Sequence, residues 1–211
     1  DHGKTTLLDK IRDTAVVDKE AGGITQAVGA TQIPIDVIKK TCGSLLEQMK
    51  INITIPGLLI IDTPGHEAFC SLRQRGGSCA DIAILVVDIN EGFKPQTLES
   101  IGFLKQFKTP FVVAATKVDR VEGWIVNKDS CFYDSFAKQP EWIKARFEEK
   151  LYKLVGQLSE QGFDSERYDR VEDFRKKIAI VPCSGITGEG IPELLMLITG
   201  LAQQFLGKEL E

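Results

Sequence analysis

The chain has little histidine and no clustered cysteine. Of its 211 residues only His2 and His66 are histidines, and the five cysteines include no Cys-x-x-Cys pair. Zinc sites use such residues at short spacings, so we expect no zinc site. The cysteines are Cys42, Cys70, Cys79, Cys131 and Cys183. Because several lie in apolar surroundings, we interpret them as buried free thiols of a reducing compartment.

Long apolar runs and an excess of basic residues are missing as well. No run approaches the roughly 20 apolar residues that cross a bilayer, and no secretory leader is visible. The formal net charge is -4, so the overall basic surface of a nucleic-acid-binding protein is absent. These absences favour a cytoplasmic protein that does not bind a membrane.

Short apolar runs are present, at four places along the chain. They are LLIID (58–62), IAILVVD (82–88), FVVAAT (111–116) and IAIVPC (178–183). Such nearly continuous, β-branched runs are typical of strands in a parallel sheet covered on both faces. Helical patterns occur at 3–13, 95–107, 140–161 and 192–206, with a short one near 36–49. The alternation predicts an α/β fold with an open, mostly parallel sheet and helices on both faces.

Two regions do not follow this alternation. Residues 14–56 contain several glycines and then TQIPID, and we interpret them as a mobile glycine-rich loop followed by an edge strand. Residues 120–177 form a long excursion, which we expect to be helical and to cover the sheet. We interpret its mixed-charge run, 163–177, as a solvated helical face.

The first residues, DHGKTT, match the second half of the phosphate-binding pattern G-x-x-x-x-G-K-[ST]. In such a loop backbone N–H groups point at phosphate oxygens, the side chain of Lys4 reaches the β- and γ-phosphates, and the Thr5 hydroxyl binds Mg²⁺. Gly3 and Thr6 belong to the same motif. The first glycine of the pattern and the preceding strand are not in this sequence, so we expect a domain truncated within the loop, without its N-terminal strand. Gly-Lys-Thr alone arises by chance in many proteins.

The string DTPGH (62–66) directly follows the run LLIID. Asp62, at a strand end, suits the Mg²⁺ shell, and Gly65 can bring its backbone N–H close to a γ-phosphate because it has no Cβ. His66 then lies beside the terminal phosphate, where a neutral imidazole orients an attacking water. The alternative is an ordinary Thr-Pro-Gly turn, which Gly-Lys-Thr upstream disfavours.

The string TKVD (116–119) follows the run FVVAAT. The stem of Lys117 can lie over a purine ring. Asp119 can accept hydrogen bonds from N1–H and the 2-amino group of guanine, a donor pair that adenine lacks, so such a site discriminates strongly. The alternative is a strand that ends in a charged turn.

Two glycine-containing segments complete the set. In CSGITGEG (183–190), which contains Ser184, the backbone N–H of Gly185 or Ile186 can bind the guanine oxygen. In EAGGITQAVGATQIP (20–34), Thr25 is a candidate Mg²⁺ ligand on a loop that γ-phosphate can order. Each segment has a plain flexible loop as its alternative.

The four nucleotide-site segments, taken in their order along the chain and on alternating strands, resemble those of a GTPase of the Ras-like superfamily. DHGKTT, DTPGH and the glycine-flanked Thr25 resemble the translational branch of that superfamily. AGGITQAVGATQIP, PGLLIIDTPGHEAF, VVDINEGFKPQT and SGITGEGIPELL are similar to the archaeal and eukaryotic initiation factors that join the ribosomal subunits, homologous to bacterial initiation factor two. The resemblance spans nearly the whole chain and implies that residues 1–211 are a P-loop GTPase (G) domain.

The resemblance also implies cofactors and partners. These are GTP or GDP, Mg²⁺, a monovalent cation bound with the help of Asp1, the large ribosomal subunit and, through other domains, initiator tRNA. It implies a cytoplasmic monomer that hydrolyses GTP on the ribosome and then leaves. The implied catalytic residues are Lys4, Gly65 and His66, and the metal ligands are Thr5, Thr25 and Asp62. The nucleotide-binding residues are Asp1, Gly3, Lys4, Thr5, Thr6, Thr116, Lys117, Asp119, Ser184, Gly185 and Ile186.

Two positions depart from the family pattern. Thr116 stands where asparagine is usual and ties the base-binding loop to the phosphate loop. Since a hydroxyl makes fewer hydrogen bonds than an amide, we expect a loss of about 1 kcal/mol in nucleotide binding. Gly185 stands where alanine is commoner, which we expect to be a mild change. Because the start of the phosphate loop is missing, we expect the chain as given to bind nucleotide poorly.

Three alternatives remain at the level of the sequence. An elongation-type GTPase that delivers tRNA shares DHGKTT and DTPGH, but the strings at 20–34 and 184–195 argue against it. Asp119 argues against an ATP-using P-loop enzyme. Lys4, Thr25 and His66 argue against an inactive scaffold that docks on the ribosome.

Overall fold

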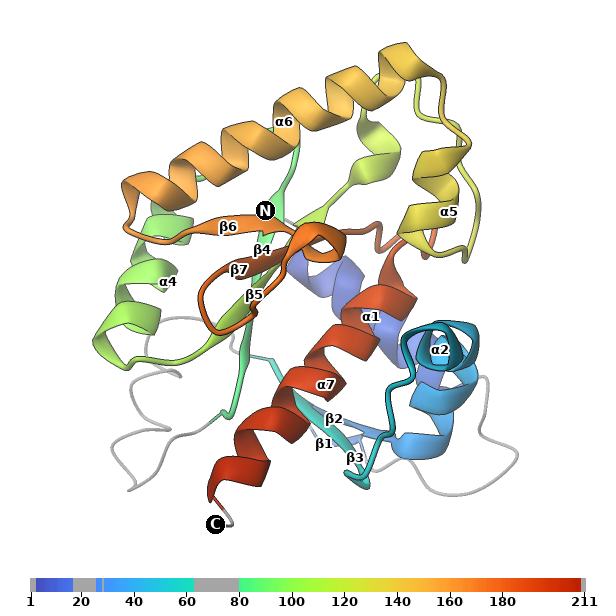
Figure 1. Cartoon of the computed structure of the whole chain (residues 1–211), viewed down its shortest axis with the longest axis vertical. Coiled ribbons are helices and arrows are strands. Elements are labelled where there is room, and N and C mark those ends of the chain that lie inside the picture. Colours follow the sequence, from blue (N-terminus) through green and yellow to red (C-terminus); the bar gives the residue numbers. More distant parts are fainter. Residues whose placement is uncertain (1–2, 17–25, 28, 63–79, 210–211) are drawn as a thin grey trace. The chain divides into compact units, whose positions relative to one another are not determined.

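Residues 3–16, 26–27, 29–62 and 80–209 are described by the computed structural model (Figure 1). The chain divides into two units, one with residues 1–10 and 83–194 and one with residues 11–82 and 195–211. The boundaries fall within α1 (Lys4–Val16) and α7 (Ile191–Glu209). Each unit is described by itself.

The first unit is built on a four-stranded parallel sheet in the order β4-β5-β7-β6. The strands are β4 (Ala83–Asp88), β5 (Phe111–Thr116), β6 (Ser165–Arg167) and β7 (Ile178–Pro182). All six residues of β5 are buried, as expected for a central strand covered on both faces. The apolar runs at 82–88, 111–116 and 178–183 are therefore confirmed as strands of a parallel α/β sheet.

Helices flank this sheet. They are α4 (Pro95–Gln106), α5 (Phe132–Ala137) and α6 (Glu141–Glu160), with short 3-10 turns η2 (Val118–Arg120) and η3 (Tyr168–Arg170). In Figure 1, α4 lies beside β4 and α6 runs along β6, and both pairs are in contact. The expected helices at 95–107 and 140–161 are confirmed within one residue at each end. The buried face of α6 consists of Ile143, Phe147, Leu151, Leu154 and Leu158.

An aromatic cluster forms the core of the 120–177 excursion. Phe147 of α6 has its ring centroid 5.2 Å from Phe132 and 5.3 Å from Phe136, both on α5, and 5.9 Å from Trp124. Phe147 and Phe132 are completely buried. Aromatic pairs at such spacings contribute beyond the area that they bury, so the loop after η2 and both helices are fixed to one another.

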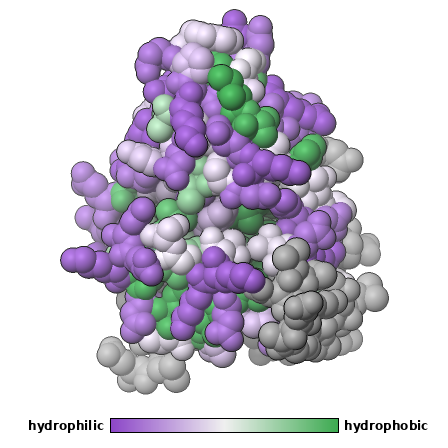
Figure 2. All heavy atoms as spheres, turned by 90° about the vertical axis from the view of Figure 1, so that its right-hand side faces the viewer, coloured by the Kyte–Doolittle hydropathy of each residue, from purple (hydrophilic) through white to green (hydrophobic). Residues whose placement is uncertain are grey.

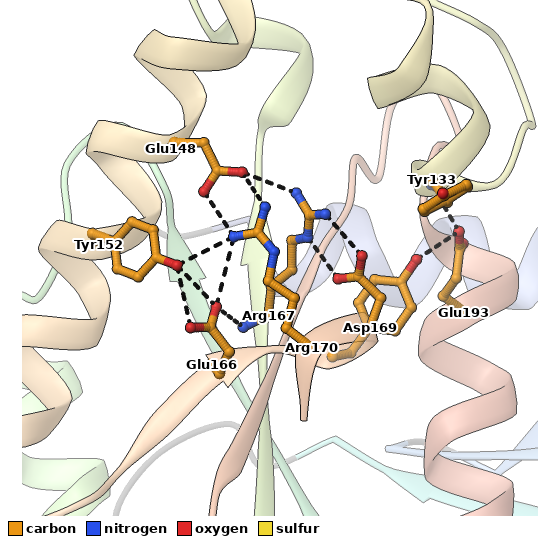
Figure 3. Close-up of polar contacts among 9 residues, drawn as sticks. Tyr133, Glu148, Tyr152, Glu166, Arg167, Asp169, Arg170 and Glu193 are labelled. Atoms are coloured by element: carbon orange, nitrogen blue, oxygen red, sulfur yellow. Dashed lines mark hydrogen bonds and ion pairs between the residues drawn. The ribbon is translucent and has the colours of Figure 1, made fainter. Parts of the chain in front are cut away.

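The mixed-charge run 163–177 is not the helical face that we expected. It contains β6, which extends the parallel sheet, and then η3. Arg167 is 4% exposed: its Nε lies 2.6 Å from Asp169 Oδ1 and its Nη1 3.2 Å from Glu148 Oε1 (Figure 3). The guanidinium also lies 4.7 Å from the Phe136 ring centroid. The prediction of a helix was therefore wrong, whereas the charges of the run other than Arg167 are half-buried or exposed, as a solvated segment requires.

The second unit contains a three-stranded antiparallel sheet in the order β1-β2-β3. Its strands are β1 (Gln26–Ala27), β2 (Ala30–Pro34) and β3 (Gly57–Ile61), and α2 (Ile35–Met49) packs against β2 and β3. The strand at TQIPID and the short helix near 36–49 are thus confirmed, but β2 pairs with β1 on one side and β3 on the other, so it is the central strand of this sheet and not the edge strand that we expected. The run LLIID was expected in a parallel sheet, but its strand, β3, pairs antiparallel with β2 because the chain returns through α2 directly beside it.

Apolar side chains lie mainly in the interior. On the face shown in Figure 2 hydrophilic side chains predominate, and apolar ones form separate patches. Cys42 and Cys183 are buried free thiols, as predicted, and Cys131 is half-buried, whereas Cys70 and Cys79 lie outside the described residues. None of the described helices is long and apolar enough to cross a membrane.

Truncation of Phe147 should destabilise the protein strongly, because its ring is completely buried among three other aromatic rings. We expect Phe147→Ala to lower the free energy of unfolding by about 3–5 kcal/mol, measured by urea denaturation. Lys153→Ala, at an exposed position of the same helix, serves as the control and should change it by no more than about 0.5 kcal/mol. Equal effects of the two substitutions would contradict the assignment of this cluster as a core.

Candidate functional site

The start of α1 lies against the loop that follows β5, within the first unit. Gly3 has φ +87, and a Cβ built on it would lie 3.6 Å from both Thr116 Oγ1 and Lys117 Cε. The Gly-Lys-Thr motif and the TKVD motif are therefore neighbours. Ligands of parallel α/β sheets bind at this end, outside the carboxyl ends of the strands.

Lys117 is held from two sides. Its Nζ lies 2.9 Å from Asp88 Oδ2, and its carbonyl accepts a hydrogen bond of 3.0 Å from Asn90 Nδ2. The residue adopts the left-handed conformation, with φ 64, which a residue other than glycine rarely does. Sequence reasoning missed Asp88 and Asn90, although their string VVDIN ends a predicted strand.

Asp88 is a buried carboxylate at the end of β4, 4% exposed. Burial alone would raise its pKa. The bonds from Lys117 and from the backbone and side-chain amides of Asn90 outweigh burial, so that the pKa lies below the ordinary value of 3.8. The carboxylate is thus charged at neutral pH and fixes the ammonium group of Lys117.

Thr116 and Asp119 flank Lys117. Thr116 is 2% exposed, and its hydroxyl donates to the Val87 carbonyl at 3.2 Å, so that it fastens the loop to β4. Asp119 lies half-buried on η2. The neighbouring Val118 N–H donates to the Cys183 carbonyl at 3.3 Å, which joins this turn to the loop after β7.

The loop after β7 is organised around Ser184. The Ser184 hydroxyl accepts hydrogen bonds from the N–H groups of Ile186 (3.2 Å) and Thr187 (3.1 Å). Of the two donors proposed for the guanine oxygen, Ile186 is therefore already engaged within the loop. The N–H of Gly185 makes no hydrogen bond to any described residue, so Gly185 is the donor that remains.

Gly185 also sets the distance between this loop and α1. A Cβ built on it would lie 2.9 Å from the backbone carbon of Thr6 and 2.9 Å from the backbone nitrogen of Leu7. Backbone atoms cannot move aside as a side chain does. Our expectation that glycine in place of alanine is a mild change here is therefore wrong.

The structure does not bring the other residues predicted for the phosphate and metal site together with these loops. Asp1, Thr25, Gly65 and His66 lie outside the described residues. Thr5 is exposed in the first turn of α1, in the first unit. Asp62 follows β3 in the second unit, where its N–H donates to the Gly29 carbonyl at 2.7 Å.

Comparison with known proteins identifies the family. Residues 1–204 match the family model described as the elongation factor Tu GTP binding domain. The chain belongs to this family. The loops at 116–119 and 183–190, which we call the purine loops, and the start of α1 all lie within the matched residues and within the first unit.

Relatives of this GTP-binding domain include several curated proteins. One from Methanopyrus kandleri, named probable translation initiation factor IF-2, is 64% identical over 211 residues. One of the same name from Archaeoglobus fulgidus is 57% identical over 210 residues. Each match covers 100% of this chain and 35% of the relative, so the chain spans about a third of the relatives' length.

Two solved structures share the fold. The structure of GDP-bound aIF5B from Aeropyrum pernix has a TM-score of 0.93 and 54% identity, and the match covers 100% of this chain and 35% of that one. The apo form of elongation factor SelB from Methanococcus maripaludis has a TM-score of 0.54 and 22% identity, covering 96% of this chain and 32% of that one. The second likeness concerns the fold alone.

The contact at Gly185 gives a first prediction for the site. Gly185→Ala should push the loop away from α1, and we expect it to weaken GDP binding and to lower the free energy of unfolding by about 1–3 kcal/mol. Gly156→Ala is the matched control. It lies in α6 with nothing within 4 Å of the added Cβ, and it should stabilise the protein by about 0.5–1 kcal/mol. Calorimetry of GDP binding and thermal unfolding measure both effects; normal GDP affinity in Gly185→Ala would refute the steric argument.

The ion pair of Asp88 and Lys117 gives a second prediction for the site. Since the pKa of Asp88 is lower in the folded than in the unfolded protein, its contribution to stability is complete above the ordinary pKa of 3.8 and is lost as the pH falls through the folded value. Asp88→Asn should remove this acid dependence and cost about 1.5–3 kcal/mol at neutral pH. The measurement is the free energy of unfolding of the original protein and of Asp88→Asn, from neutral to acid pH. If both proteins lost stability in parallel as the pH fell, the acid dependence would not come from Asp88.

Proposed function

We propose that this chain is the GTP-hydrolysing domain of a translation initiation factor that promotes the joining of ribosomal subunits and leaves after hydrolysis. The observation that carries the proposal is the convergence, in one unit, of Gly3 at the start of α1 with the loop at Thr116 and Lys117 and with Gly185. The family match over residues 1–204 supports GTP as the ligand. The names of the relatives support a role in initiation.

Guanine is read by three groups in this proposal. Asp119 accepts hydrogen bonds from N1–H and the 2-amino group, the stem of Lys117 covers the ring, and the Gly185 N–H binds the 6-oxygen. Ser184 and Ile186 shape the loop that presents this N–H. Adenine would leave the carboxylate of Asp119 unpaired, which is the kind of mismatch that proteins reject most strongly.

Hydrolysis proceeds by in-line attack of water on the γ-phosphate. Lys4, in the first turn of α1, and the N–H groups around Gly3, Thr5 and Thr6 hold phosphate oxygens. Gly65 fixes the γ-phosphate by its N–H, and His66 orients the water. Contact with the ribosome brings His66 into place, and activation in other GTPases is worth about 10³–10⁵-fold.

The chemistry of the donors fits a magnesium ion. A threonine hydroxyl and a carboxylate are oxygen ligands of the kind that Mg²⁺ takes, and Thr5, Thr25 and Asp62 supply them in this proposal. When bound, the ion neutralises phosphate charge. Asp1 helps to hold a monovalent cation near the phosphates.

The partners follow from the same proposal. The domain acts in the cytoplasm as a monomer on the large ribosomal subunit, and initiator tRNA is bound by parts of the protein other than residues 1–211. The excursion at 120–177 covers the sheet of this domain, in keeping with the contact between α6 and β6.

An assay of subunit joining tests the function. The full-length protein with GTP should accelerate association of the two subunits, followed by light scattering, and should release phosphate only when both subunits are present. ATP should not replace GTP. Delivery of aminoacyl-tRNA to the decoding site, without acceleration of joining, would instead identify an elongation-type factor.

His66→Ala tests the catalytic role. We expect it to reduce ribosome-stimulated phosphate release by about 10³-fold or more, because the attacking water is no longer oriented. GTP affinity should stay within about two-fold of the original, since the imidazole is not used for binding in the ground state. Normal stimulated turnover in this variant would exclude His66 from the water-positioning role.

A further inference from the structure

A buried acid that the proposed site does not use lies at the end of the loop after β7. Glu189 is 0% exposed, and its side chain reaches three segments of the first unit. Its Oε2 accepts a 3.0 Å hydrogen bond from Trp124 Nε1 and a short one from the Ser135 hydroxyl. Its Oε1 accepts a 2.8 Å hydrogen bond from the Thr187 hydroxyl.

The main chain of the same loop is closed by Glu189. Its carbonyl accepts a 2.8 Å hydrogen bond from the Ser184 N–H, and the Gly188 N–H donates to the Ser184 carbonyl at 3.0 Å. The Thr187 carbonyl accepts from the Asp129 N–H at 2.8 Å. The Gly185 N–H thus belongs to a loop whose two ends are hydrogen-bonded to each other and whose Thr187 carbonyl is hydrogen-bonded to the excursion.

The donors around Glu189 show what this position requires, which is a side chain that can satisfy three separate hydrogen-bonding groups. All three are neutral, and no ion pair joins Glu189 to another described residue. Burying a carboxylate without a cation is costly. A carboxylate, however, accepts on both oxygens, so one side chain satisfies an indole from the loop after η2, a hydroxyl from α5 and a hydroxyl from its own loop.

We propose that Glu189 is a positioning residue for guanine: it fastens the 184–190 loop to Trp124 and α5 and so holds the Gly185 N–H at the 6-oxygen of the base. The inference rests on the proposed function. It makes the 120–177 excursion part of the nucleotide site's support as well as a cover for the sheet.

Removal of the acid should act on guanine affinity and not on turnover. In the full-length protein we expect Glu189→Ala to raise the dissociation constant for GDP by about ten-fold or more, while kcat at saturating GTP stays unchanged. Glu189→Gln should restore most of the affinity. Its amide oxygen can accept from Trp124 and Ser135, and its NH₂ group can donate to the Thr187 hydroxyl.

A ligand without the 6-oxygen separates positioning from general loosening of the fold. Wild-type protein should lose affinity on going from GDP to 6-thio-GDP, which keeps N1–H and the 2-amino group for Asp119 but has sulfur, a weak acceptor, in place of the 6-oxygen. Glu189→Ala should lose much less in this step, because the contact to the 6-oxygen is already gone. A merely structural role would weaken both ligands by the same factor, and that result would overturn the inference.

Glu193 provides the matched control. It is as buried as Glu189, but its Oε1 accepts from the Tyr133 N–H and the Tyr168 hydroxyl, both at 3.3 Å (Figure 3), and it meets none of the three donors. Glu193→Ala, the same truncation as Glu189→Ala, should leave the GDP dissociation constant unchanged. A loss equal to that of Glu189→Ala would show that any buried acid in this region has the same effect, against the inference.

Two further outcomes are informative. If Glu189→Ala does not fold, Trp124→Phe combined with Ser135→Ala removes both donors to Oε2 and should give the same selective loss; unchanged GDP affinity there would refute the inference. If the wild-type protein binds no GDP, the proposed function itself fails. If the wild type binds GDP and neither variant differs from it, only the role of Glu189 fails.

Discussion

The arrangement of the purine loops depends on the close approach of backbone to backbone. Gly185 meets the main chain at Thr6 and Leu7, where an added Cβ would lie 2.9 Å from backbone atoms. This contact is rigid, because main-chain atoms on both sides are already fixed in a helix or a hydrogen-bonded loop. Gly3 lies against the side chains of Thr116 and Lys117, and there its φ of +87, more than a lack of space, favours glycine. The order of the parallel strands brings these segments to one end of the sheet, and the two glycines decide how near they come.

Buried charges stabilise the first unit in three different ways. Asp88 is paired with a cation, Lys117, and its pKa is lowered. Arg167 is paired with Asp169 and also stacks on an aromatic ring. Glu189 has neutral donors only. The first two arrangements satisfy charge by charge, whereas the third uses a carboxylate for its capacity to accept several hydrogen bonds at once.

Much of the fold follows from local patterns. Strands β4, β5 and β7 and the long helix α6 were predicted because uninterrupted β-branched runs and a 3.6-residue apolar period are strong signals. The strand β6 was not, because three residues with a buried Arg167 carry no apolar signal. The antiparallel pairing of β3 depends on which neighbour the chain meets after α2, and a run such as LLIID has the same composition in either direction.

In the candidate site, too, residues of short motifs were predicted, whereas residues whose role depends on distant partners were not. The motif strings predicted Lys117, Thr116 and Gly185, since each motif is a short stretch of sequence with its own chemistry. The supporting residues Asp88 and Glu189 lie within strings that the sequence analysis quoted, but those strings assigned them no chemical role. Their function depends on partners far away in sequence, Lys117 for the first and Trp124 and Ser135 for the second, and only the folded chain brings these together.

At Thr116, anchoring of the base-binding loop is shared among several residues. In the family pattern an asparagine at this position ties the base-binding loop to the phosphate loop. Here the Thr116 hydroxyl donates to the Val87 carbonyl, and Gly3 lies directly against it. An amide still reaches the loop, because Asn90 Nδ2 donates to the Lys117 carbonyl from the end of the adjacent strand. The loop is therefore anchored to β4 by two hydrogen bonds and an ion pair. This anchoring accounts for the left-handed backbone of Lys117, which costs about 1–2 kcal/mol and persists only where the surroundings hold it.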